Sequence, residues 1–133
     1  MERASDGIAG HGGHPPRPSS IPLPSRARIE EAAGIMRALG DPERLRLLLR
    51  LAEGEACVSE LAELEHEKVT TVSARLKMLS AVRLVMRRRQ GRHIFYALAD
   101  EHVLPLIRNA IEHAAEGRTA VSADPGHRED TTR

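Results

Sequence analysis

Two carboxylates and two imidazoles recur near the C-terminal end of this 133-residue chain, at a spacing that suits a metal ion. Asp100 is followed two positions later by His102, and His113 is followed three positions later by Glu116. Imidazole nitrogen and carboxylate oxygen are ligands of zinc, and they suit cobalt and nickel as well. The residue types therefore predict a divalent-metal site.

The spacing between the two pairs indicates that one chain cannot complete this site. A helix advances about 1.5 Å and turns about 100° per residue, so a helix through both histidines returns His113 to nearly the azimuth of His102, roughly 16 Å away. Two such helices packed antiparallel across a two-fold axis place Asp100 and His102 of one beside His113 and Glu116 of the other. The pattern predicts a symmetric homodimer with two identical metal sites.

The charges of the chain are unevenly distributed. The formal net charge is only +1, but a basic stretch follows an acidic one. The arginines of the basic stretch are Arg83, Arg87, Arg88, Arg89 and Arg92. Such a local patch is more informative than the total charge and favours contact with nucleic-acid phosphates.

The composition indicates one aliphatic, helical domain in a reducing compartment. Aromatic residues make up 2% of the chain, and Cys57 is its single cysteine, so no intramolecular disulfide can form. No apolar run approaches the roughly 20 residues that span a bilayer, and the N-terminus lacks the apolar core of a signal peptide. We expect a cytoplasmic protein with no membrane partner.

Helical spacing and capping residues predict the elements that precede the basic stretch. Apolar residues recur at helical spacing from Arg26 to Leu39, where Gly40 is a plausible C-cap. Asp41 and Pro42 then form an N-cap and first helical position, and the following leucine-rich helix ends at Gly54. A short helix from Val58, with Ser59 as a possible cap, and a second helix over 70–81 form a helix-turn-helix.

The rest of the chain predicts a β-hairpin and a terminal helix. The hairpin comprises the arginine stretch, a turn at 90–92 and a β-favouring run over 93–96. The last helix begins near Asp100 and fades at Gly117. We therefore divide the chain into a flexible N-terminal arm over 1–25, a domain over 26–117 and a disordered tail over 118–133.

This order of elements, with the residues that fill it, resembles the ArsR/SmtB family of bacterial metal-sensing repressors. The resemblance covers about 32–116. It rests on the segments 38–42 with Arg44 and Leu45, 57–62, 71–73 with Leu76 and Leu79, 88–93 with Tyr96, and the terminal helix. It implies a mainly α (α+β) fold, a winged helix-turn-helix with a two-stranded β-hairpin wing and a C-terminal dimerisation helix.

The resemblance also implies a function. A homodimer would occupy operator double-stranded DNA when metal-free and leave it on binding metal, which would derepress an efflux or sequestration gene. Zn²⁺ is the first expectation, with cobalt, nickel, cadmium or lead as alternatives within the family. In relatives that sense metal through the terminal helix, the ligands match Asp100, His102, His113 and Glu116. Four such ligands without an open position resemble a regulatory site rather than a catalytic one.

A second family site joins a cysteine and an acidic residue of the third helix to ligands on the N-terminal arm. Cys57 and Glu60 match the helical pair, and the arm offers His11 and His14. We favour the interpretation that Cys57 is a small, half-buried apolar residue and that this second site is lost.

The resemblance makes the helix over 70–81 the recognition helix of the DNA-binding half. The residues that we expect near DNA are Thr70, Thr71, Ser73, Arg75 and Lys77 on this helix and Arg87, Arg88, Arg89 and Arg92 on the wing. The turn between the two helices is atypical, because Glu65, His66 and Glu67 stand where the family usually has a glycine-containing turn. Two acidic side chains there either point away from DNA or alter the operator preference.

Two other classes of function remain open at this point. A small metallohydrolase using His102 and His113 would need an open coordination position and a general base, and no further constellation supplies them. The stronger rival is a DNA-binding protein that ignores metals, or that senses another signal through Cys57, with the terminal helix serving only as a dimer interface.

Overall fold

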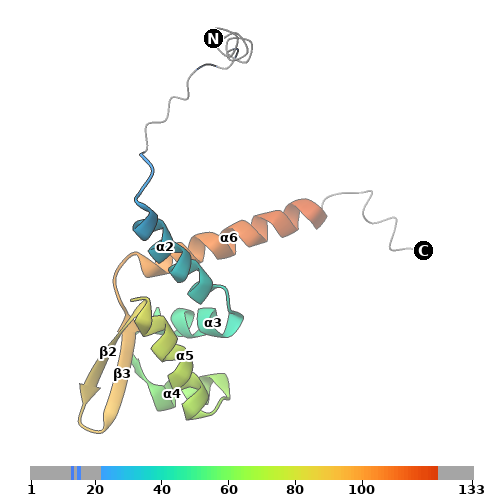
Figure 1. The fold of residues 1–133 in the computed structure, drawn as a ribbon. Helices are drawn as coiled ribbons and strands as arrows, with labels where there is room; N and C mark the ends of the chain where they lie inside the picture. The colour runs from blue at the N-terminus through green and yellow to red at the C-terminus, as the bar shows by residue number, and fades with distance from the viewer. Residues whose placement is uncertain (1–12, 14, 16–21, 123–133) are drawn as a thin grey trace.

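The computed structural model describes Gly13, Pro15 and residues 22–122, with the backbone alone for 118–122, and it is shown in Figure 1. His11 and His14 lie outside the described residues. In chain order the elements are α2 (Arg26–Leu39), α3 (Pro42–Leu51), β1 (Ala56–Cys57), α4 (Val58–Glu65), α5 (Val69–Ala81), β2 (Val85–Gln90), β3 (His93–Leu98) and α6 (Val103–Ser122). No helix in these ranges is long and apolar enough to cross a membrane.

The corner between α2 and α3 is fixed by side chains that bond the free ends of both helices. Asp41 caps α3, since its carboxylate accepts a hydrogen bond from the Arg44 N–H at 2.9 Å. The Arg44 guanidinium turns back and donates to the Ala38 carbonyl at 2.7 Å and to the Arg37 carbonyl at 3.3 Å. These bonds give partners to carbonyls in the last turn of α2, where the regular helical hydrogen bonds end, and the Gly40 N–H also donates to the Arg37 carbonyl at 3.1 Å. The predicted bounds of α2 and start of α3 are confirmed.

The core is aliphatic apart from one tyrosine, and α3 lies at its centre, as its leucine pattern predicts. Leu47 and Leu48 of α3 are fully buried. The largest other buried side chains come from α4, α5, β3 and α6: Leu61, Val72, Leu76, Leu79, Tyr96 and Ile107. α5 packs against α3, α4 and the sheet, which gives this helix a rigid base.

The sheet has three strands rather than the two that the sequence predicts. β1 pairs antiparallel with β3, with Ala56 opposite Tyr96 and Cys57 opposite Phe95. β3 also pairs with β2, so the strand order is β1, β3, β2. A strand of two residues has no periodicity of its own to detect, because it forms only where β3 offers it an edge.

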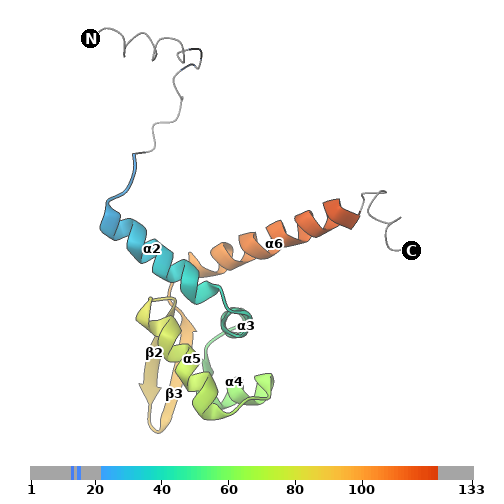
Figure 2. The same ribbon diagram turned by 45° about the vertical axis from the view of Figure 1, so that its right-hand side comes forward.

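The hairpin of β2 and β3 forms the wing, which projects beside α5 in Figures 1 and 2. Its two-residue turn begins with Gly91 at φ +62°, a left-handed conformation that glycine adopts without steric cost. The predicted hairpin is confirmed, and its strands extend two residues before Arg87, to Val85, and two residues beyond Tyr96, to Leu98.

Helix α6 differs from its predicted bounds at both ends. It begins at Val103, because the Asp100 carboxylate accepts the His102 N–H at 2.8 Å and forms a turn before the helix. It continues through Gly117 to Ser122, so residues 118–122 are helical rather than part of a disordered tail. Glycine weakens a helix by only about 1 kcal/mol relative to alanine, which is too little to end this one.

The atypical turn between α4 and α5 closes with a histidine where glycine is usual. His66 is in the left-handed conformation, at φ 56° and ψ 44°, and the Glu67 N–H donates to the Ala62 carbonyl at 3.0 Å. These are the backbone features of a glycine-type helix C-terminus, so the turn keeps its shape without a glycine.

Glu65 links α4 to α3 through two arginines of α3. Its carboxylate is 4% exposed and accepts hydrogen bonds from Arg46 Nε at 2.6 Å and from Arg50 Nε at 2.7 Å. The hydrogen bond from Arg46 is the main cause that lowers the pKa of the Glu65 carboxyl below 4.5, with Arg50 adding to it.

Replacing Glu65 by glutamine is expected to lower the free energy of unfolding by about 1 to 2 kcal/mol at pH 7, since two charge-assisted bonds to partly exposed arginines are lost. Because the folded-state pKa is lowered, the stabilisation is complete above the unfolded-state pKa and vanishes as the pH falls through the folded-state value. Urea unfolding of both proteins from pH 7 to acid measures this. Parallel stability curves would contradict the assigned role.

Candidate metal and DNA-binding sites

Asp100 and His102 form a compact, exposed pair in the turn between β3 and α6. One carboxylate oxygen of Asp100 accepts a hydrogen bond from the backbone N–H of His102, and it lies 3.4 Å from the Nδ1 atom of the His102 ring. The two side chains are 54% and 85% exposed. A carboxylate accepts up to about four hydrogen bonds, so this turn orients Asp100 and leaves lone pairs for a metal ion.

The pair lies on the rim of a largely apolar groove of about 440 Å³ between α2, the end of α5 and the start of α6. The groove is lined by Glu31, Gly34 and Ile35 of α2, by residues 81–84, and by Asp100, His102, Val103 and Leu106. The turn that carries Asp100 and His102 therefore shares a surface with the C-terminal end of α5.

His113 and Glu116 lie on the outer half of α6. They are three residues apart, so they share one face of the helix, and all side chains from Arg108 to Gly117 are exposed. Figures 1 and 2 both show this half of α6 extending beyond the rest of the domain. Within the described part of one chain, no three histidine, cysteine, aspartate or glutamate side chains are grouped to hold a metal. The four predicted ligands therefore occur as two separated pairs.

The Cys57 and Glu60 pair has a helix-capping arrangement. Glu60 accepts the Cys57 backbone N–H at 2.9 Å, and the Cys57 Sγ lies 3.2 Å from the Ser59 Oγ. The backbone hydrogen bond from Cys57 is the main cause that lowers the pKa of the Glu60 carboxyl. Cys57 rather than Ser59 is the N-cap residue of α4, and it is buried. This geometry accounts for both residues without a metal.

Helix α5 presents a polar, partly cationic face. Thr70 and Lys77 are exposed, and Thr71 and Ser73 are half-buried. Arg75 is only 24% exposed, and its Nη1 lies 3.5 Å from the Glu67 carboxylate. Of the two acidic residues in the atypical turn, Glu65 therefore points away from this face and Glu67 borders it.

The wing arginines divide between the two faces of the sheet. Cross-strand register places Arg88 on the face of Phe95 and Arg87 on the face of Tyr96. Arg88 donates two hydrogen bonds to Glu55, at 2.8 and 2.9 Å, and its guanidinium lies 4.9 Å from the centre of the Phe95 ring. Its hydrogen bond with Glu55 lowers the pKa of that carboxyl. The sequence cannot show this contact, because the two residues are far apart in the chain.

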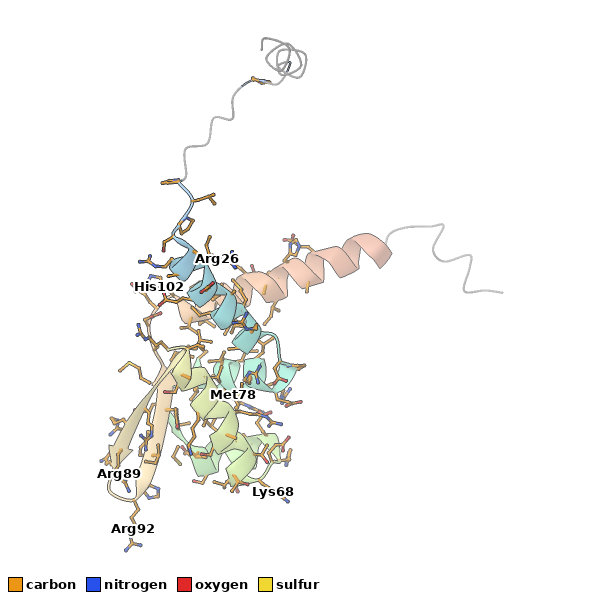
Figure 3. All side chains as sticks on the ribbon, in the orientation of Figure 1. Arg26, Lys68, Met78, Arg89, Arg92 and His102 are labelled. Carbon is orange, nitrogen blue, oxygen red and sulfur yellow. The ribbon has the colours of Figure 1, made fainter. Side chains whose placement is uncertain are left out.

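Lys68 is a basic residue at this surface that sequence reasoning missed. It precedes the first residue of α5 and is exposed. Figure 3 shows Lys68, Arg89 and Arg92 toward the same end of the molecule, with His102 toward the opposite end. Its place immediately before the helix over 70–81, which the sequence predicts to contact DNA, was the available signal.

Comparison with known proteins agrees with this arrangement. The sequence of residues 41–87 matches the family model of bacterial regulatory proteins of the arsR family. The transcriptional repressor SmtB of Mycobacterium tuberculosis is 39% identical over 98 residues, which are 73% of each chain. A CadC homolog of Staphylococcus aureus, a cadmium resistance transcriptional regulatory protein, is 32% identical over 87 residues, 65% of this chain and 72% of its own.

A solved structure shows the same fold. The homodimeric winged helix-turn-helix DNA-binding domain Mb0332 of Mycobacterium bovis is 32% identical, with a TM-score of 0.65 over 73% of this chain and 92% of that one. The winged helix-turn-helix predicted from the sequence is thereby confirmed. This chain belongs to the ArsR family of bacterial helix-turn-helix regulators, and it is a DNA-binding transcriptional regulator rather than an enzyme.

Proposed function

We propose that this protein is a cytoplasmic, homodimeric repressor that binds operator DNA when metal-free and is released by Zn²⁺, which derepresses metal efflux or sequestration genes. Each of two metal sites joins Asp100 and His102 of one subunit to His113 and Glu116 of the partner subunit. Cobalt and nickel suit the same donors, because selectivity among divalent metals depends on geometry and availability.

The observation that carries this proposal is the division of the four ligands into two exposed pairs within one chain. Each pair alone offers a divalent ion one imidazole and one carboxylate, which is too few donors for a closed site. The outer half of α6 also carries Ile111, which is 45% exposed, and Met36 of α2 is 57% exposed. A second subunit that covers these side chains would bring the pairs together, and the homodimeric relative supports such a partner.

The residues present fit a divalent metal by their chemistry. Two imidazoles and two carboxylates would offer a divalent ion four borderline and hard donors, and the side chains of both pairs are exposed. The bound ion would neutralise the two carboxylates and link two subunits. The relative with cadmium resistance in its name supports a response to a divalent metal.

A direct path leads from the ligands to the recognition helix. The Ala99 N–H, next to Asp100, donates to the Leu84 carbonyl at 3.0 Å, and Leu84 closely follows α5. Metal ligation across the dimer would fix the turn at Asp100 and, through this bond and the shared groove, the orientation of each α5. A dimer reads two half-sites about 34 Å apart, so a small rotation of both helices is enough to lose one of them.

The experiment that tests this function is a zinc titration of the protein bound to DNA from its own promoter, followed by fluorescence anisotropy. We expect zinc to weaken binding by about 5- to 150-fold, the range of typical allosteric coupling. A chelator should restore binding. Unchanged affinity on adding zinc, cobalt and nickel in turn would leave a DNA-binding protein that is not regulated by these metals.

A further inference from the structure

Arg75, the one arginine of α5, is held by an acidic residue that is not on its helix. Its Nη1 lies 3.5 Å from the Oε2 atom of Glu67, and the two side chains are 24% and 33% exposed. A partly buried pair is screened less by salt than a pair on the open surface. The guanidinium therefore has an orienting partner before DNA arrives.

The carboxylate comes from a turn of fixed shape. The Glu67 N–H is bonded to the Ala62 carbonyl at 3.0 Å, and the preceding His66 is in the left-handed conformation that ends α4. The backbone of Glu67 is thus held by α4 while its side chain reaches α5. Both side chains therefore extend from backbone of fixed position.

The position of the pair places a negative charge at the edge of a surface that otherwise attracts phosphate. Thr70, Ala74 and Lys77 are exposed on α5, where Val69 and Met78 are exposed as well, and Arg75 is half-buried. Arginine donates to guanine O6 and N7, and glutamate accepts from the cytosine amino group, whereas a carboxylate beside a phosphate is repelled. A paired Arg75 is therefore less available to phosphates of any sequence than a free one.

We propose that Glu67 is a specificity-determining residue, which holds Arg75 for base contact and withholds it from unspecific phosphate contact. The inference rests on the proposed placement of α5 at DNA. In this proposal the atypical turn has a role, because Glu67 lowers the affinity for unrelated DNA more than it lowers the affinity for the operator. The specificity ratio, rather than the operator affinity alone, is the property that Glu67 sets.

The test compares binding of wild type and Glu67→Gln to two duplexes: one selected from a random pool by the wild type, and one unrelated duplex of equal length. We expect Glu67→Gln to bind the unrelated duplex about 5-fold more tightly, with a salt slope steeper by about 0.9 per subunit, because a freed arginine adds one phosphate contact. The affinity for the selected duplex should rise less, so the specificity ratio falls. The double variant Glu67→Gln/Arg75→Gln should lose the added slope.

Glu63→Gln is the matched control, because Glu63 is an exposed glutamate of α4 and the substitution changes the net charge equally. If Glu63→Gln reproduces the effect, or if Glu67→Gln leaves the slope and the specificity ratio unchanged, the proposal is wrong. Lys77→Ala distinguishes a wrong role for Glu67 from a wrong placement of α5 at DNA. If Lys77→Ala weakens binding while Glu67→Gln does nothing, α5 contacts DNA and only the role of Glu67 is refuted. Thermal unfolding confirms that each variant is folded.

Discussion

Replacing His102 by alanine is expected to abolish the response of the DNA complex to zinc and to leave the affinity of the metal-free protein for DNA unchanged. His102 is 85% exposed, so its loss removes no core packing, and it lies toward the opposite end of the molecule from Arg92. Removing a residue that hydrogen-bonds to a metal ligand lowers metal affinity about 10- to 100-fold. Removing the ligand itself should therefore lower zinc affinity by at least about 100-fold. A zinc titration of the DNA complex, monitored by fluorescence anisotropy, measures both the zinc response and the DNA affinity of the metal-free protein.

Glu101→Ala is the control for this substitution. Glu101 stands between the two ligands and is exposed, so it shares their surroundings but belongs to neither pair. It should keep the zinc response. If His102→Ala still responds to zinc and Glu101→Ala does not, the ligand set is wrong even if the protein senses metal.

The double substitution Arg89→Ala/Arg92→Ala is expected to weaken DNA binding about 10- to 100-fold and to reduce the salt slope by about 1.8 per subunit, because two phosphate contacts are lost. Both side chains are exposed, and they lie on the wing toward the same end of the molecule as Lys68. Measuring the dissociation constant at several salt concentrations gives the slope directly.

Arg88→Ala should behave differently from its neighbours. Because Arg88 is bonded to Glu55 and lies over Phe95, we expect its loss to lower the thermal stability while leaving most of the salt slope intact. A loss of slope equal to that of the double variant would show that Arg88 exchanges Glu55 for phosphate. An unchanged slope in the double variant would place the DNA surface elsewhere.

Residues whose structure depends on their neighbours in sequence were predictable. Asp41 followed by Pro42 starts a helix by local chemistry, and α2 ends at Leu39 as the glycine after it indicates. His113 and Glu116 share one face of α6 as their spacing predicts, whereas Asp100 and His102 lie in the turn before that helix. The ArsR family and its fold followed from the order of such local signals.

Contacts between distant segments were not predictable in the same way. β1 forms only by pairing with β3, and Glu55, the residue before β1, is thereby brought within hydrogen-bond distance of Arg88. The sequence predicts the start of α6 near Asp100, but the helix begins at Val103, because the Asp100 carboxylate accepts a hydrogen bond from the His102 N–H. The pairing of Arg75 with Glu67 depends on the left-handed residue between α4 and α5, which residue type alone does not indicate.

The most direct test of the central claim, that each metal site is shared between subunits, is to mix His102→Ala and His113→Ala proteins and measure bound zinc. Each variant alone should bind no zinc at these sites. In a mixed dimer both substitutions fall on one site, and the other site has all four ligands. Random exchange of subunits should then restore about one zinc for every four chains, against one per chain in the wild type. A mixture that binds no more zinc than the separate variants would contradict a shared site.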